Sequence, residues 1–271
     1  MTLTASIPTA SNARVFLLGA WVNPVGQRQA IETILSWCAT RQSRYVVTPN
    51  LDHCRMLQTD RALVEAYDKA GLALADGWPL VASSFLTPFH LSRRVTGADI
   101  IEPLCRACAA SGYSIFLLGT TAETLAAASD ALKQSIPGLL IAGTYSPSFG
   151  FEHDGAEAAK IDAEITRARP HVVFVALGSP KQELWMSAHV PALPIGAALG
   201  IGAGIDFIAK KQRRAPVLLR WMALEWMWRA VSNPKRLIRR YAACLLAFPG
   251  LLAAHLSLHL VHRTGVRSPE P

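Results

Sequence analysis

Short apolar runs alternate with helix-like segments along residues 14–209, and each run ends in a glycine or a polar residue. The clearest run, 171–177, leads into Gly178 and a new helical segment, and 114–119 behaves in the same way. Apolar runs bounded by turn signals are typical of buried parallel strands, and strands that alternate with helices form doubly wound sheets. The sequence therefore predicts an α/β, Rossmann-like fold: a mostly parallel sheet with helices on both faces.

The order of the elements follows from the same pattern. Loops are expected over 87–92 and 145–153, and a glycine-rich turn over 200–204. That turn only loosely resembles the dinucleotide fingerprint, because the phosphate-binding version follows the first strand. The expected strands are 14–20, 44–48, 72–75, 114–119, 139–143, 171–177 and 194–200, and the expected helices are 26–39, 51–58, 60–70, 78–86, 100–110, 122–135 and 156–168.

Asp76 is the first candidate for chemistry, because it ends the apolar run 72–75 and is followed by Gly77. This position lies at the carboxyl edge of the predicted sheet, where open α/β folds bind ligands. The alternative is that Asp76 only caps the next helix. Thr48 and Asn50 follow the strand 44–48 and are expected at the same edge.

Two other segments offer groups that could hold an anion. Lys181 and Gln182 follow Gly178 at the start of a helix, which favours ligand contact over a plain turn. Arg93 and Arg94 precede a Thr-Gly turn into a helix, where they either bind an anion or form a solvated charged loop.

The carboxyl-terminal part of the chain has a different composition from the rest. The net charge is +8 with 51% hydrophobic residues, and residues 207–271 hold twelve basic and two acidic residues. Such a basic and apolar segment favours a membrane surface or a phosphate-rich ligand. We therefore divide the chain into a loose arm (1–13), a Rossmann-like domain (14–209) and a helical appendage (210–271).

Within the appendage, 215–232 reads as an amphipathic helix rich in Trp and Arg, and 241–260 is apolar enough to be considered as a membrane span. Pro249 and Gly250 favour a broken helix that lies on or dips into the bilayer. His255, His259 and His262 lack an accompanying carboxylate or cysteine, so no metal is expected there. The five scattered cysteines, including the pair Cys105 and Cys108, indicate a reducing compartment and neither disulfides nor a metal site.

Several of these segments together resemble a known family over about 14–241. The sequence is similar to the WecG/TagA/CpsF family of bacterial glycosyltransferases (glycosyltransferase family 26). The resemblance lies in 48–50 (Thr-Pro-Asn), 75–77 (Ala-Asp-Gly), 94–99 (Arg-Val-Thr-Gly-Ala-Asp), 178–183 (Gly-Ser-Pro-Lys-Gln-Glu), 206–209 (Asp-Phe-Ile-Ala), 214–216 (Arg-Ala-Pro) and 224–226 (Leu-Glu-Trp).

The resemblance implies an enzyme at the cytoplasmic face of the inner membrane, bound peripherally. It would transfer a hexosyl unit from a UDP-sugar to a polyprenyl-diphosphate-linked sugar in cell-envelope or exopolysaccharide synthesis, with inversion. It further implies catalytic roles for Asp76, as general base, and Thr48. Substrate binding would fall to Asn50, Arg94, Gly178, Lys181, Gln182, Glu183 and Asp206, and lipid-diphosphate or membrane contact to Arg214, Arg229, Arg236 and Arg239.

No cofactor, metal or nucleic-acid partner is expected, and self-association is left open. The sequence contains no Asp-x-Asp, so the departing diphosphate would be met by Arg, Lys and helix N-termini. Leu51, Asp52, Trp78 and Lys210 depart from the family pattern, which leaves the sugar undecided between glucose, N-acetylmannosamine and its uronic acid. The alternatives are a nicotinamide-dependent oxidoreductase and a non-catalytic membrane-surface module.

Overall fold

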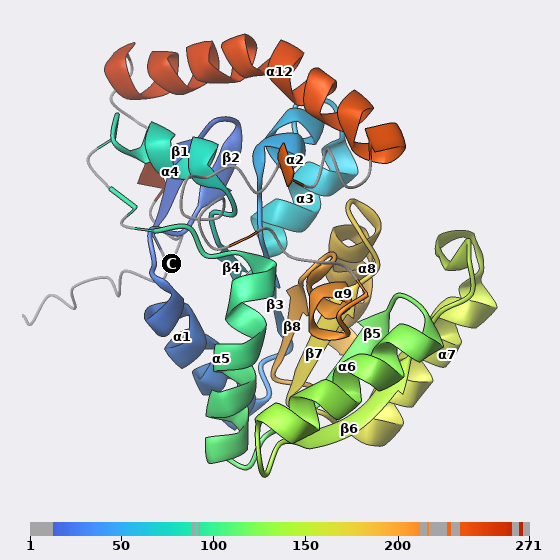
Figure 1. The fold of residues 1–271 in the computed structure, drawn as a ribbon. Coiled ribbons are helices and arrows are strands. Elements are labelled where there is room, and N and C mark those ends of the chain that lie inside the picture. The colour runs from blue at the N-terminus through green and yellow to red at the C-terminus, as the bar shows by residue number, and fades with distance from the viewer. Residues whose placement is uncertain are drawn as a thin grey trace, which may run out of the picture.

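The computed structural model describes residues 13–87, 90–91, 93–211, 216, 227–228, 234–261 and 266–267. Within these residues a six-stranded, all-parallel sheet has the order β4-β3-β8-β7-β5-β6 (Figure 1). The α/β, Rossmann-like prediction is thereby confirmed. The strands are β3 (Arg44–Val47), β4 (Leu72–Ala73), β5 (Ser114–Gly119), β6 (Leu140–Tyr145), β7 (Val172–Ala176) and β8 (Ala197–Gly200).

Helices cover both faces of this sheet, and each face has its own apolar core. One face carries α1 (Gln27–Thr40), α5 (Gly97–Ala110), α6 (Ala122–Ser135) and the short α9 (Gly204–Ile208). The other face carries α3 (Arg61–Lys69), α7 (Gly155–Ala168) and α8 (Lys181–His189). The short helix α2 (Leu51–Met56) and α4 (Trp78–Ser84) follow β3 and β4, and single 3-10 turns lie at Phe151–His153 and Val190–Ala192.

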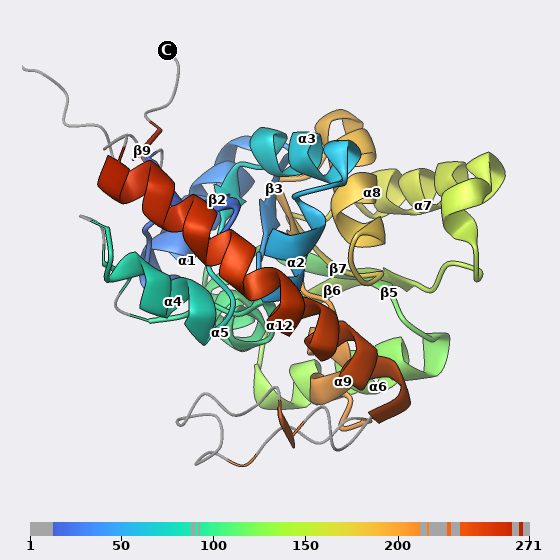
Figure 2. The ribbon, with the colours of Figure 1, turned by 90° about the horizontal axis from the view of Figure 1, so that it is seen from above.

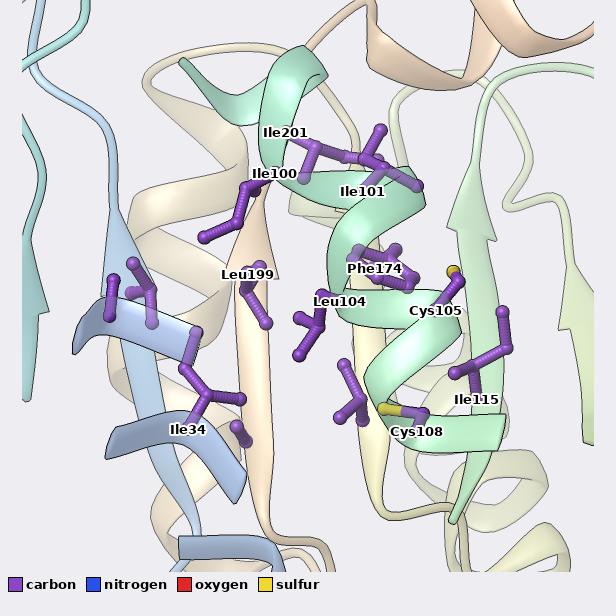
Figure 3. Close-up of a cluster of buried hydrophobic side chains, with 14 of the residues drawn as sticks. Ile34, Ile100, Ile101, Leu104, Cys105, Cys108, Ile115, Phe174, Leu199 and Ile201 are labelled. Carbon is purple, nitrogen blue, oxygen red and sulfur yellow. The ribbon is translucent and has the colours of Figure 1, made fainter. Parts of the chain in front are cut away.

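The core beneath α5 explains the cysteine pair. Leu104 of α5 packs against Phe174 and Leu199 of the sheet, and Cys105 and Cys108 point into the same apolar cluster (Figure 3). Burial raises the pKa of the Cys108 thiol to about 12 and that of Cys105 still further. Both thiols therefore stay protonated and contribute to packing.

The first predicted strand exists but does not belong to the parallel sheet. β1 (Arg14–Leu17) turns back at once into β2 (Ala20–Val22) and pairs with it antiparallel. Leu18 and Gly19 both have positive φ, 49° and 94°, which is the backbone of a tight hairpin turn. The prediction of a strand followed directly by a helix was wrong here, because the turn reverses the chain. The third strand of this small sheet is β9 (Val266–Arg267).

Asn23, which follows the hairpin, covers the outer edge of β4. Its side-chain Oδ1 accepts a hydrogen bond from the Ala73 N–H at 2.8 Å, and its own N–H donates to the Ala73 carbonyl at 2.8 Å. The carboxamide Nδ2 donates to the Ala13 carbonyl at 3.1 Å. One asparagine thus occupies both polar groups of the edge residue Ala73.

The carboxyl-terminal helix α12 (Pro234–Leu256) continues into a π-helical turn (Ser257–Val261) and runs across the molecule over α2 (Figure 2). The expected break at Pro249 was wrong, because the helix passes through it. Pro249 is exposed, and the carbonyl that lacks its donor belongs to Leu245 on the same exposed side, where water can bind it. The predicted helix 215–232 lies almost entirely outside the described residues.

Close packing at Gly196 yields a stability prediction. A Cβ at this buried glycine would lie 2.4 Å from Cys38 Cα, so Gly196→Ala should force β8 and α1 apart. We expect a loss of about 1–3 kcal/mol in the free energy of unfolding, measured by urea denaturation. Gly155→Ala is the control, because nothing lies within 4 Å of a Cβ there. Equal stabilities of the two variants would contradict the close contact between Gly196 and Cys38.

Candidate active site

The carboxyl ends of β3, β4, β8 and β7 bring the predicted groups to one edge of the sheet. Val47 pairs with Ala73, and Val46 with Leu199, so the residues that follow these strands are neighbours. The Thr48 hydroxyl, which is buried, donates to the Gly200 carbonyl at 3.2 Å. This bond fixes the loop after β3 against the glycine-rich turn after β8.

Asp76 does not cap the helix that follows it. The N-cap of α4 is Gly77, and no side chain accepts a hydrogen bond there. Gly77 has φ 111° and ψ 151°, a conformation essentially restricted to glycine, and it turns the chain between Asp76 and the helix. The half-buried carboxylate is therefore held at the sheet edge, and the capping alternative was wrong.

Three loops lie side by side around Asp76. The Asp76 N–H donates to the Pro49 carbonyl at 2.8 Å, and the Val95 N–H donates to the Ala75 carbonyl at 2.9 Å. Arg94, half-buried, precedes Val95 and so enters the same neighbourhood. These loops are far apart in the sequence, and the structure brings them side by side.

Asn50 has a structural role in addition to its place at this edge. Its Oδ1 accepts hydrogen bonds from the backbone N–H groups of Asp52 (3.0 Å) and His53 (3.3 Å) and so caps α2. Among the described residues, its Nδ2 group has no hydrogen-bond partner. The donor half of this carboxamide is the part that a ligand could use.

Gln182 and Glu183 lie beneath the edge. Gln182 is 2% exposed; its Nε2 donates to Glu183 Oε1 at 2.8 Å, and its Oε1 accepts from the Gly202 N–H at 3.2 Å. A Cβ on Gly200 would lie 2.9 Å from that Nε2, so the glycine makes room for the amide. Gln182 therefore joins the turn after β7 to the turn after β8, whereas the sequence predicted ligand contact.

Glu183 is fully buried, and its Oε2 has no hydrogen-bond partner among the described residues. Close to it lies a pair that the sequence did not indicate: the Tyr67 hydroxyl and His53 Nδ1 are 2.8 Å apart, and both residues are buried. His53 belongs to α2, which directly follows the loop after β3. This polar cluster supports the loop after β3 from below.

The buried cluster has shifted proton affinities. Burial lowers the pKa of His53, and the Glu183 carboxylate opposes this effect. Burial raises the pKa of Tyr67 well above its ordinary value, and the carboxylates of Glu183 and Asp76 add to the shift. Tyr67 therefore stays protonated and acts as a hydrogen-bond donor to a neutral His53.

The remaining predicted residues lie farther along the edge. Lys181 pairs with Glu152, and its Nζ stands 5.5 Å from the centre of the exposed Phe149 ring. Gly178 has φ 77° at the end of β7. Asp206, on the first turn of α9, accepts a hydrogen bond from the Thr120 hydroxyl at 3.2 Å.

The basic appendage residues are only partly described. Arg239 is exposed on the first turns of α12. Arg236 lies in the same helix, but its side chain is outside the described set, and Arg214 and Arg229 lie outside the described residues altogether. Among the described residues, no group of three or more His, Cys, Asp and Glu side chains could hold a metal ion.

A parallel sheet with helices on both faces and polar residues at its carboxyl edge is the general form of a nucleotide-dependent transferase or oxidoreductase. Comparison of the sequence separates these classes. Residues 15–260 match the Glycosyl transferase WecG/TagA/CpsF family, and the chain belongs to that family of glycosyltransferases. The resemblance drawn from the motifs is confirmed.

Relatives within this class come from Staphylococcus aureus. Proteins named N-acetylglucosaminyldiphosphoundecaprenol N-acetyl-beta-D-mannosaminyltransferase, from strains MW2, NCTC 8325 / PS 47 and MRSA252, are 27% identical to the chain over 234 residues. The match covers 85% of this chain and 89% of each relative.

Protonation of His53 provides a test of the buried cluster. Because its pKa is below the ordinary value of 6.5 in the folded protein, the unfolded chain binds this proton more tightly. The stability contribution of His53 is therefore complete above pH 6.5 and falls as the pH drops from there towards the folded pKa. NMR titration of the imidazole should give a midpoint below 6.5.

The control for this titration is Tyr67→Phe, which removes the hydroxyl donor and keeps the burial. The midpoint should rise but stay below 6.5, because burial is the largest cause of the shift. A wild-type midpoint at or above 6.5 would show that the imidazole is not buried as a neutral ring.

Proposed function

We propose that this glycosyltransferase transfers a hexosyl unit, with inversion, from a UDP-sugar to a polyprenyl-diphosphate-linked sugar. The donor that the relatives favour is UDP-N-acetylmannosamine, because their names specify an N-acetylmannosaminyl group and an N-acetylglucosaminyl-diphosphate lipid. UDP-glucose and the uronic acid of N-acetylmannosamine are the donors to test against it. The product serves cell-envelope or exopolysaccharide synthesis.

Asp76 is the proposed general base. An inverting transfer requires a group that takes the proton of the acceptor hydroxyl as the new bond forms. The observation that carries this assignment is that Asp76 lies just beyond the carboxyl end of β4 without capping α4. Gly77 and the hydrogen bond from the Asp76 N–H to Pro49 hold the carboxylate at a fixed place, as a positioned base requires.

The departing UDP needs positive charge and hydrogen-bond donors. Arg94 lies beside Asp76, and the Nδ2 of Asn50 is a donor at the same edge. Lys181 and Gly178 lie at the start of α8, whose N-terminus has no side-chain cap. Together with the basic appendage, these groups are our candidates for stabilising the diphosphate. Thr48, Gln182 and Glu183 would hold the loops that present them.

The acceptor lipid requires that the enzyme meet a membrane, and α12 offers the surface. A stretch within Leu237–His259 has the length and apolar composition of a membrane-crossing helix, with a mean hydropathy of 1.7, and 17% of it is buried. Leu237, Cys244, Leu251 and His255 face the protein. The opposite side is apolar and exposed at Ile238, Ala242, Leu245, Leu246, Pro249, Gly250, Ala253 and Ala254.

This spacing places all eight exposed residues on one stripe of the helix. A helix that packs along its whole length on the protein and is apolar on its outer side suits a position in the plane of the membrane interface. Phe85 and Leu86, also apolar and exposed, follow directly on α4, which packs in the same apolar cluster as α12. We therefore place the enzyme peripherally at the cytoplasmic face of the inner membrane.

Asp76→Asn tests the catalytic assignment. The amide cannot accept the acceptor proton, so the turnover number should fall by about 10²–10⁴-fold while the dissociation constant of UDP stays unchanged. The assay is a screen of radiolabelled UDP-sugars with lipid-linked N-acetylglucosamine in detergent or vesicles. Asp130→Asn, at an exposed position of α6, is the matched control and should retain full turnover. Nearly unchanged turnover in Asp76→Asn would remove the base assignment.

Charge on the outer side of α12 tests the membrane assignment. Leu245 and Leu246 are 73% and 84% exposed, so Leu245→Glu with Leu246→Glu should leave the fold intact. Sedimentation with anionic phospholipid vesicles should fall by about tenfold or more, because two apolar side chains leave the interface and two acidic groups replace them. Leu140→Glu, at a residue that is 54% exposed on the edge strand β6, is the control. Equal vesicle binding of all variants would exclude this surface.

A further inference from the structure

The helix α12 meets the rest of the protein through polar contacts at two places. Near its start, Arg240 lies against Asp52 of α2, and near its end, His255 Nδ1 and Nε2 lie 3.2 Å and 3.0 Å from the carbonyls of Phe16 and Ser83. Between them the contact is apolar, with Leu251 packed among residues of β1, β2, α2 and α4. Figure 2 shows the helix crossing directly over α2.

Asp52 is the centre of the first contact. Its side chain is 11% exposed, and its Oδ2 lies 2.7 Å from Arg240 Nε; this contact is an ion pair without a directed hydrogen bond. Its Oδ1 accepts hydrogen bonds from Arg55 Nη2 at 2.8 Å and Nε at 3.1 Å, and from the Cys244 thiol at 3.7 Å. Two guanidinium groups thus share one largely buried carboxylate.

The apolar composition of α12 makes this contact more important than an ordinary ion pair. Burial of apolar surface has no preferred direction, and α12 carries apolar residues on both its inner and its outer side. Burial alone therefore does little to choose which side faces α2. A charged pair at a defined position does make that choice, as polar residues fix the register of packed helices elsewhere.

Asp52 is also joined to the candidate active site. Its backbone N–H donates to Asn50 Oδ1 at 3.0 Å, and Pro49 next to Asn50 accepts from the Asp76 N–H at 2.8 Å. The path from Arg240 on α12 to the Asp76 backbone therefore runs through the short segment 49–52. A rotation of α12 would pull directly on this segment.

From these contacts we propose that Asp52 is a positioning residue: through Arg240 it fixes the rotation of α12 over the active-site edge. This pairing would couple the apolar surface of α12 to the placement of Asn50 and Asp76. The inference rests on the proposed function for its kinetic consequence, since the acceptor is taken to arrive along the surface that α12 forms. The structural consequence of the pairing, a fixed orientation of α12, does not depend on the proposed function.

Two substitutions, Asp52→Asn and Arg240→Gln, test the coupling in the full-length protein. Each removes the charge attraction and should raise amide hydrogen exchange in α12 and the KM for the lipid-linked acceptor, by about tenfold. The KM for the UDP-sugar should change less than the KM for the acceptor, because Arg94, Gly178 and Lys181 among its candidate contacts lie outside the segment 49–52. The conservative variants Asp52→Glu and Arg240→Lys keep the charges. In these variants, hydrogen exchange in α12 and the KM for the acceptor should both stay close to the wild-type values.

The second arginine at the same carboxylate supplies the matched control. Arg55→Gln removes a hydrogen-bonded partner of Asp52 within α2 and leaves Arg240 in place. It should change neither the acceptor KM nor exchange in α12. Glu102→Gln, which breaks an exposed ion pair with Arg106 on α5, should be equally silent.

Two outcomes would overturn the proposal. Unchanged exchange in α12 and unchanged acceptor KM in Asp52→Asn and Arg240→Gln would show that the pair does not hold the helix. Equal effects of Arg55→Gln and Arg240→Gln would assign Asp52 to the stability of α2 alone. If the wild-type protein transfers no sugar, the proposed function fails, whereas the exchange measurement still decides whether Asp52 positions α12.

Discussion

Two backbone hydrogen bonds hold the parts of the candidate active site together. One joins the Asp76 N–H to the Pro49 carbonyl, and the other joins the Val95 N–H to the Ala75 carbonyl. The first continues the alignment of β3 and β4 beyond the ends of the strands, and the second joins the segment after β4 to the segment before α5. Three loops from distant parts of the chain therefore lie side by side at the edge of the sheet where open α/β folds bind ligands.

The parallel sheet could be predicted because its signals are local. Each apolar run and each helical period lies within a few residues, and the polar residue that ends a strand must lie at the sheet edge. The exceptions had local causes that hydrophobicity does not report. Positive φ at Leu18 and Gly19 makes a hairpin of the first strand, and Pro249 stays within α12 because it lies on the exposed side.

The buried residues that support the candidate site were less predictable than the residues at the sheet edge. Asp76, Thr48 and Asn50 carry a signal, since each lies within three residues of the end of a strand. His53, Tyr67 and Glu183 lie on three different helices, and nothing in the sequence indicates that they are buried together. Gln182 lies beside the predicted turn. The direction of its side chain depends on the space left by Gly200, which is a property of the packed structure.

Asn23 bears on how copies of this chain could associate. The strand at one margin of a sheet normally exposes N–H and C=O groups to which a strand of another molecule can add. At β4 the backbone of Ala73 is already occupied by the side chain and the main chain of Asn23. A continuous sheet across two molecules at this margin would require Asn23 to leave, so the margin is closed from within the chain by a single asparagine.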